Sequence, residues 1–94
     1  PKPPPPSKKL DDADKLDAAR QDISIGNLEE AVKTYAKLVK RGKMVEEIIM
    51  DIQEALRKHP VDVGLWQTLG DAYMRADRLQ DALDSYSKAE DLLR

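Results

Sequence analysis

Four short breaks, spaced about 17 residues apart, divide most of this chain into segments of nearly equal length. The breaks are Gly26-Asn27, Gly42-Lys43, His59-Pro60 and Asp77-Arg78. Glycine, asparagine and proline mark turns because they favour backbone conformations that end a helix. Between the breaks, apolar residues recur every third or fourth position, which is the period of an amphipathic helix. The spacing therefore predicts helices joined by turns so short that neighbouring helices must run antiparallel.

The predicted helices cover residues 11–25, 28–41, 44–58, 62–75 and 78–93. Asp62 is placed as the N-cap of the fourth helix, where its carboxylate would accept from a free backbone N–H. Asn27 and Glu30 have the spacing of a capping box for the second helix. The third helix has the clearest apolar face, which consists of Val45, Ile48, Ile49, Ile52, Ala55 and Leu56.

The composition favours an all-α fold with a modest core. Charged residues are abundant, phenylalanine is absent, and the apolar residues are mostly Leu, Ile, Val and Ala, whereas sheets favour β-branched and aromatic runs. No run approaches the roughly 18 apolar residues of a membrane span. The chain starts without Met and lacks an apolar signal core, and we expect it to be part of a larger protein. Cysteine is absent, which leaves the compartment undecided, with the cytoplasm favoured.

The charges are unevenly distributed along the chain. The whole chain has a formal charge of −2, and residues 1–9 carry +3, so the remaining residues carry −5. A protein that binds nucleic acid usually shows a basic folded part, because it must neutralise phosphates. We therefore expect no nucleic acid among the partners.

A motif in the last third of the chain points to a family. Trp66, Leu69, Gly70 and Tyr73 stand as W-x2-L-G-x2-Y, and Ala82 and Tyr86 follow as A-x3-Y. This pattern resembles the signature of the tetratricopeptide repeat (TPR) family, with Tyr in place of the usual second Phe. The resemblance implies an α-solenoid of antiparallel helices, about two and a half repeats long, that holds other proteins and has no chemistry of its own.

The resemblance places repeats at about residues 29–62 and 63–94, within a helical domain over residues 11–94. The helix predicted at 11–25 is then an extra helix that caps the N-terminal end. A second phase stays open, because residues 26–35 also resemble the second helix of a repeat that begins in the first helix.

Residues 1–10 have the composition of a flexible, proline-rich linker. Consecutive prolines favour an extended polyproline II conformation and supply no backbone donors for a core. The alternative is a ligand for an SH3-type domain, because Pro3, Pro6 and Lys8 fit a P-x-x-P pattern with a basic flank.

The candidate binding residues lie on the helices that would line the concave face of the solenoid. They are Lys33, Lys37, Lys40 and Arg41 in the second helix, and Gln67, Asp71 and Met74 in the fourth. The four basic residues follow helical spacing without an intervening acid, which suits an acidic peptide or a terminal carboxylate. The alternative is a solvated face, since cations near a helix C-terminus are favoured by the helix dipole. Trp66 and the three tyrosines, Tyr35, Tyr73 and Tyr86, are interpreted as core.

The sequence therefore predicts a non-catalytic protein-interaction module whose partner is a protein or peptide, and the basic residues favour an acidic one. No metal site, cofactor or catalytic set is expected, because the single histidine, His59, has no cysteine or second histidine to join it. The alternative function is self-assembly as a homodimer through the C-terminal helix. Leu83, Tyr86 and Leu93 would then form an uncovered face at that end of the stack.

Overall fold

The computed structural model describes residues 11–94, which form an all-α fold without strands. The linker predicted for residues 1–10 lies outside the described residues. The five helices are α1 (Asp12–Ser24), α2 (Leu28–Lys40), α3 (Val45–Lys58), α4 (Val63–Arg75) and α5 (Leu79–Leu92). Each begins and ends close to its predicted bounds. Within residues 11–94, no helix is both long enough and apolar enough to cross a bilayer.

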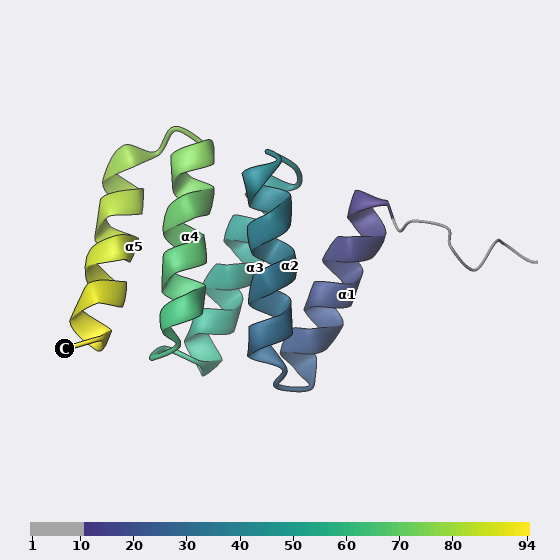
Figure 1. Ribbon diagram of the computed structural model, residues 1–94, viewed down its shortest axis with the longest axis horizontal. Coiled ribbons are helices and arrows are strands. Elements are labelled where there is room, and N and C mark those ends of the chain that lie inside the picture. The colour runs from purple at the N-terminus through teal and green to yellow at the C-terminus, as the bar shows by residue number, and fades with distance from the viewer. Residues whose placement is uncertain (1–10) are drawn as a thin grey trace, which may run out of the picture.

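Successive helices run antiparallel and stack along one direction, as the sequence predicted (Figure 1). α2 and α4 lie side by side, and α3 crosses behind them and packs against both. α1 packs against α2 at one end of the stack, and α5 packs against α4 at the other. This arrangement is the predicted α-solenoid, with α1 and α5 as its two ends.

Three of the four turns end the preceding helix in the same way. Gly26, Gly42 and Asp77 have positive φ angles of 81°, 71° and 61°. The next residue in each turn then donates its backbone N–H to a carbonyl five positions earlier, at 2.8–2.9 Å. This is the Schellman arrangement, which satisfies helix carbonyls that would otherwise lack a partner. The regular breaks in the sequence are therefore helix C-terminal signals.

The predicted helix caps are correct at one position and wrong at another. Asp62 caps α4, because its Oδ1 accepts from the Leu65 N–H at 2.9 Å. Asn27 makes no side-chain hydrogen bond at the start of α2, so the predicted capping box is wrong. The N–H of Asn27 is already bonded to Asp22 in the Schellman turn, which holds its ψ at 67°. That backbone is not the extended conformation from which Asp62 caps α4.

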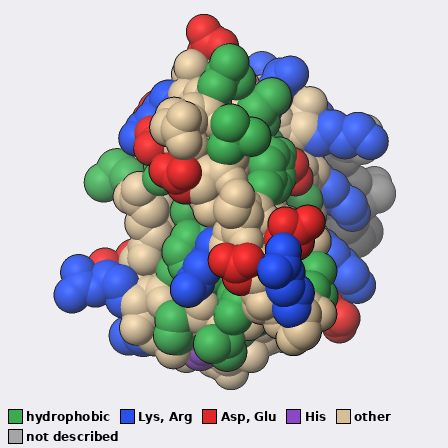
Figure 2. All heavy atoms as spheres, turned by 90° about the vertical axis from the view of Figure 1, so that its left-hand side faces the viewer, with side chains coloured by type: hydrophobic (Ala, Val, Ile, Leu, Met, Phe, Trp, Pro, Cys, Tyr) green, Lys and Arg blue, Asp and Glu red, His purple; other side chains and the backbone are tan. Residues whose placement is uncertain are grey.

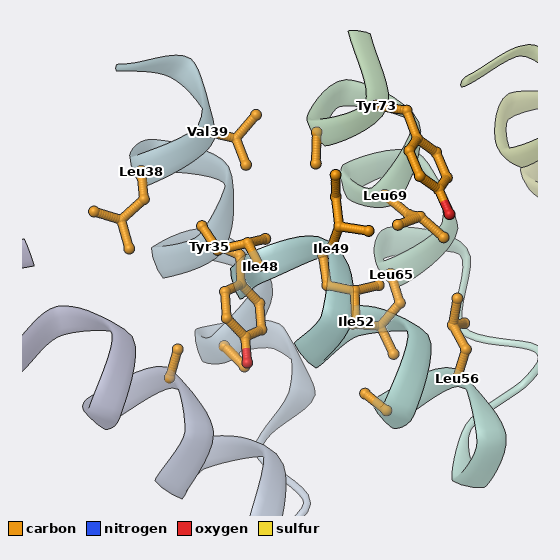
Figure 3. Close-up of a cluster of buried hydrophobic side chains, with 14 of the residues drawn as sticks. Tyr35, Leu38, Val39, Ile48, Ile49, Ile52, Leu56, Leu65, Leu69 and Tyr73 are labelled. Atoms are coloured by element: carbon orange, nitrogen blue, oxygen red, sulfur yellow. The ribbon is translucent and has the colours of Figure 1, made fainter. Parts of the chain in front are cut away.

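The core lies between α2, α3 and α4, with contributions from α1 and α5 (Figure 3). Its largest fully buried side chains are Tyr35, Leu38, Ile48, Ile52 and Leu65. Tyr35 and Tyr73 are buried, as predicted. Trp66 and Tyr86 are only half-buried and lie at the edge of the core. The indole N–H of Trp66 donates to the carbonyl of Pro60 at 2.8 Å, which ties α4 to the turn before it.

Gly70 allows α4 and α5 to approach closely. A Cβ atom at this position would overlap the ring of Tyr86, which lies directly against the glycine. Ala82 and Ala89 of α5 are buried on the same side of the helix, so small residues line the crossing. The Gly and Ala positions of the motif thus allow the tight contact between α4 and α5.

Candidate functional site

The predicted basic residues of α2 are distributed over two sides of the helix. Lys37, Lys40 and Arg41 line a hollow of about 450 Å³ between α1 and α2. Lys33 lies on the other side, where α2 faces the start of α4, and forms an ion pair with Glu30 at 3.2 Å. The structure thus brings three of the four residues together and separates the fourth.

The hollow between α1 and α2 is here called the basic groove. It is lined by Lys15 of α1, by Thr34, Lys37, Leu38 and Lys40 of α2, and by Arg41, which directly follows α2. Leu38 is buried and provides an apolar floor. Lys15 was not among the predicted site residues. Sequence periodicity identifies residues that share one helix face, but it does not show which residue of a neighbouring helix lies opposite.

The cations of the basic groove are largely unpaired within the domain. Arg41 donates to Asp12 of α1 at 3.0 Å. Within residues 11–94, Lys15, Lys37 and Lys40 form no ion pair. Lys37 and Lys40 lie in the last turn of α2, where the helix dipole favours positive charge. The groove therefore offers ammonium donors above an apolar floor, which suits an anionic group attached to an apolar chain.

A second hollow, here called the mixed groove, lies between α2, α4 and α5. Its lining residues are Ala36, Val39, Lys40, Asp71, Met74, Arg75 and Tyr86. The structure therefore brings Asp71 and Met74 together, and Lys40 borders both grooves. Gln67 is exposed on α4. Within residues 11–94, no cluster of His, Asp or Glu is placed to hold a metal ion.

Tyr86 is held in the mixed groove by a hydrogen bond that its hydroxyl donates to Asp71. Burial, together with the hydrogen bond to the negatively charged Asp71 carboxylate, raises the pKa of the Tyr86 phenol to about 12. The phenol therefore remains a donor at neutral pH. Asp71 is consequently occupied by a group of the domain itself, which reduces its capacity to bind a cation.

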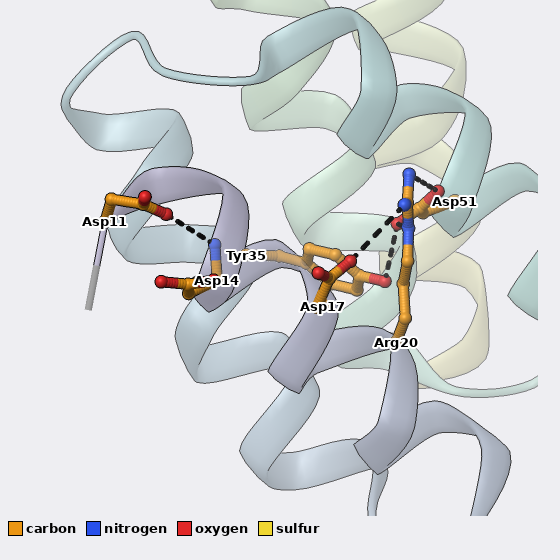
Figure 4. Close-up of polar contacts among 6 residues, drawn as sticks. All are labelled: Asp11, Asp14, Asp17, Arg20, Tyr35 and Asp51. Atoms are coloured by element: carbon orange, nitrogen blue, oxygen red, sulfur yellow. Dashed lines mark hydrogen bonds and ion pairs between the residues drawn. The ribbon is translucent and has the colours of Figure 1, made fainter.

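A polar network that the sequence analysis did not predict joins the first three helices (Figure 4). Arg20 of α1 donates to both carboxylate oxygens of Asp51 in α3, at 2.8 and 3.2 Å. Tyr35 of α2 donates to the same carboxylate at 3.1 Å. Burial and the neighbouring Asp51 raise the pKa of the Tyr35 phenol, and the bond to Asp51 raises the pKa of Arg20. Asp51 thus fixes α1 onto α2 and α3.

Comparisons with known proteins match the chain to one family and to two partial relatives. The family model described as "Bacterial transcriptional activator domain" matches residues 7–94, which is nearly the whole chain. Human and mouse superkiller complex protein 3 are each 39% identical to it over 46 residues, or 49% of this chain. The matched segment covers only 3% of each relative. No solved structure matches the chain.

Proposed function

Because the chain belongs to the bacterial transcriptional activator domain family, we propose that it is a non-catalytic protein-interaction domain that binds an acidic segment of a partner in the basic groove. The family name refers to transcription, so the partner would be another component of the regulatory machinery. The helical-repeat fold supports this proposal, because such stacks offer extended surfaces to other polypeptides. The TPR resemblance of residues 66–86 supports it in the same way.

One observation carries the proposal. Lys15 and Lys37 come from different helices, yet they line the same hollow with Lys40, and none of the three has an acidic partner within residues 11–94. Solvated surface lysines alternate with acids on many helices, and pairs of this kind occur elsewhere in this domain, as at Glu30 and Lys33. Several unpaired cations above a buried leucine instead favour a bound anion.

The charge balance of the domain favours an acidic protein segment over nucleic acid. The chain outside its first nine residues carries a net charge of −5, which repels a polyphosphate backbone at long range. A short acidic segment needs only the local field of the groove, because charges beyond about 8 Å are screened at physiological salt. The aliphatic stems of the lysines that line the groove add apolar contact area for such a segment.

The proposal is tested by titrating the domain against a fluorescein-labelled peptide of alternating Glu and Leu and reading its anisotropy. The variant Lys37→Glu/Lys40→Glu reverses two charges of the groove. Exposed charge contacts contribute up to about 1 kcal/mol each, and reversal adds repulsion, so we expect affinity to fall by about tenfold or more. A labelled DNA duplex in the same assay is expected to show no saturable binding.

The matched control is Arg57→Glu/Lys58→Glu in α3. These two residues are exposed and also lie in the last turn of a helix, so the control makes the same change in net charge and in helix-dipole energy. We expect it to alter peptide affinity by less than about twofold. Equal losses in both variants would show that net charge, rather than the basic groove, attracts the peptide. Tighter binding of the duplex than of the peptide would contradict the proposal.

A further inference from the structure

Arg41 lines the basic groove and is already bonded to an acidic side chain of the same domain. Its Nη1 donates to Asp12, in the first turn of α1, at 3.0 Å. The other cations of the groove, Lys15, Lys37 and Lys40, form no ion pair within residues 11–94. Asp12 therefore neutralises one of the four cations that are proposed to hold an acidic ligand.

The pair between Asp12 and Arg41 differs from most ion pairs of residues 11–94. The others, apart from Arg20–Asp51, join residues three or four positions apart: Asp17–Arg20, Glu30–Lys33, Arg78–Asp81 and Glu90–Arg94. Such pairs follow from the geometry of a single helix. Figure 2 looks onto the α5 end of the stack, where acidic and basic side chains are intermixed. Asp12 and Arg41 instead face each other across the contact of α1 and α2, 29 positions apart, beside the basic groove.

We propose that Asp12 is an intramolecular competitor for the basic groove, which occupies Arg41 until an acidic segment replaces it. This inference rests on the proposed function of the groove and adds the residue that sets its affinity. A carboxylate of a ligand would form the same charge-assisted hydrogen bond to the guanidinium that Asp12 forms. The negative charge of Asp12 also repels an anion that approaches Arg41. Because Asp12 belongs to the same chain, its concentration near Arg41 stays high at every dilution.

The bond between Asp12 and Arg41 is accessible enough to be exchanged. The side chains of Asp12 and Arg41 are 29% and 51% exposed, and exposed ion pairs contribute little to stability. The second half of α1 is held more firmly, because Arg20 donates twice to Asp51, whose side chain is only 15% exposed (Figure 4). Replacement of Asp12 at Arg41 therefore frees the first turn of α1 and leaves the rest of the helix in place.

The start of α1 does not depend on the charge of Asp12. The N-cap is Asp11, whose Oδ1 accepts from the Asp14 N–H at 2.8 Å (Figure 4). Leu16 and Ala19 are buried and anchor the helix in the core. Asp12→Asn nearly preserves the shape of the side chain and removes its charge. This substitution therefore tests competition for Arg41 while the cap and the apolar contacts of α1 remain.

The experiment uses the 94-residue chain and the labelled Glu–Leu peptide, with anisotropy as the readout. Asp12→Asn is expected to strengthen binding by about three- to fivefold, because Arg41 becomes available and a repulsive charge is removed. A double-mutant cycle identifies Arg41 as the shared partner. In an Arg41→Gln background, Asp12→Asn is expected to change the affinity by less than about 1.5-fold, because the group for which Asp12 competes is absent.

The matched control is Asp14→Asn, which removes the same charge from the same turn of α1. Asp14 is exposed and forms no ion pair within residues 11–94, so we expect its replacement to alter affinity by less than about 1.5-fold. Equal gains in Asp12→Asn and Asp14→Asn would overturn the proposal, because net charge alone would then explain them.

Weaker binding by Asp12→Asn would also overturn the proposal, because Asp12 would then position Arg41 for the ligand. An affinity that Asp12→Asn leaves unchanged would contradict this inference alone. Absence of peptide binding in the unmodified chain and in every variant would contradict the proposed function, and this inference with it.

Discussion

The two ends of the helix stack are built differently. At the N-terminal end, the outer side of α1 carries exposed polar residues such as Asp14, Asp17 and Gln21, and Arg20 joins α1 to Asp51. At the C-terminal end, α5 carries the exposed leucines Leu79 and Leu83, and the exposed Leu93 follows it directly. Repeat stacks need a polar terminal helix to end in water. α1 has such a polar outer side and α5 does not, so only the α5 end presents an apolar surface.

The largest expected effect on stability comes from truncating a buried side chain of α3, compared with truncating an exposed side chain at the equivalent position of α5. Ile49→Ala creates a cavity in the core and is expected to lower the free energy of unfolding by about 2–5 kcal/mol. Leu83→Ala, one repeat length later, removes a side chain that is already 58% exposed and is expected to cost less than about 0.5 kcal/mol. Urea unfolding followed by circular dichroism measures both values. Similar costs would show that the face of α5 is covered in solution.

The next effect compares the two tyrosine–aspartate bonds. Tyr35→Phe removes a buried donor from Asp51 in the network that holds α1, and we expect a loss of about 1–1.5 kcal/mol. Tyr86→Phe removes the bond to Asp71 at the open end, where water can replace the donor, so we expect a loss of about 0.5 kcal/mol. Thermal unfolding of both variants shows which substitution lowers stability more. The reverse order would mean that α5 is held more firmly than α1.

The pH dependence of stability tests the same phenols. The Tyr86 pKa is raised from 10.0 to about 12, and the Tyr35 pKa is raised as well, so the unfolded chain releases these protons more easily than the folded one. The stability contribution is therefore complete below pH 10 and is lost as the pH rises towards 12. Tyr86→Phe should flatten part of this decline in urea unfolding series. If stability falls with pH equally steeply in Tyr35→Phe and Tyr86→Phe as in the unmodified chain, the decline is caused by other titrating groups.

The smallest expected effect concerns Lys33, which lies outside the basic groove. Its ion pair with Glu30 is more than half exposed at both partners, so Lys33→Ala should change stability by less than about 0.5 kcal/mol. The variant should also leave binding of the Glu–Leu peptide within about twofold, whereas Lys37→Ala should weaken it measurably. Equal losses of peptide affinity in the two variants would show that Lys33 also contributes to binding, so that the site extends across α2.

The helices could be predicted from the sequence because their signals are local. Apolar periodicity and the breaks at Gly26 and Gly42 depend on neighbouring residues only, and so does the cap at Asp62. The Asn27 cap failed because two local signals competed, and the turn that ends α1 determined its backbone.

The grooves and the polar network could be predicted only in part, because they depend on how helices meet. Lys15 joins the basic groove across the α1–α2 contact, and Asp51 meets Arg20 across 31 positions of sequence. No periodic pattern reports such contacts. The division of the chain into repeats 29–62 and 63–94 stays a prediction.

Trp66 gives the domain an internal optical probe. It is the only tryptophan of the chain, it is anchored to Pro60, and it borders a hollow that Leu56 of α3 and Lys88 of α5 also line. Indole emission shifts to longer wavelength as water gains access to the ring. Detachment of α5 alone would therefore shift the emission maximum of Trp66 to longer wavelength before the helical circular dichroism signal is lost. The C-terminal helix can thus be followed without attaching a dye.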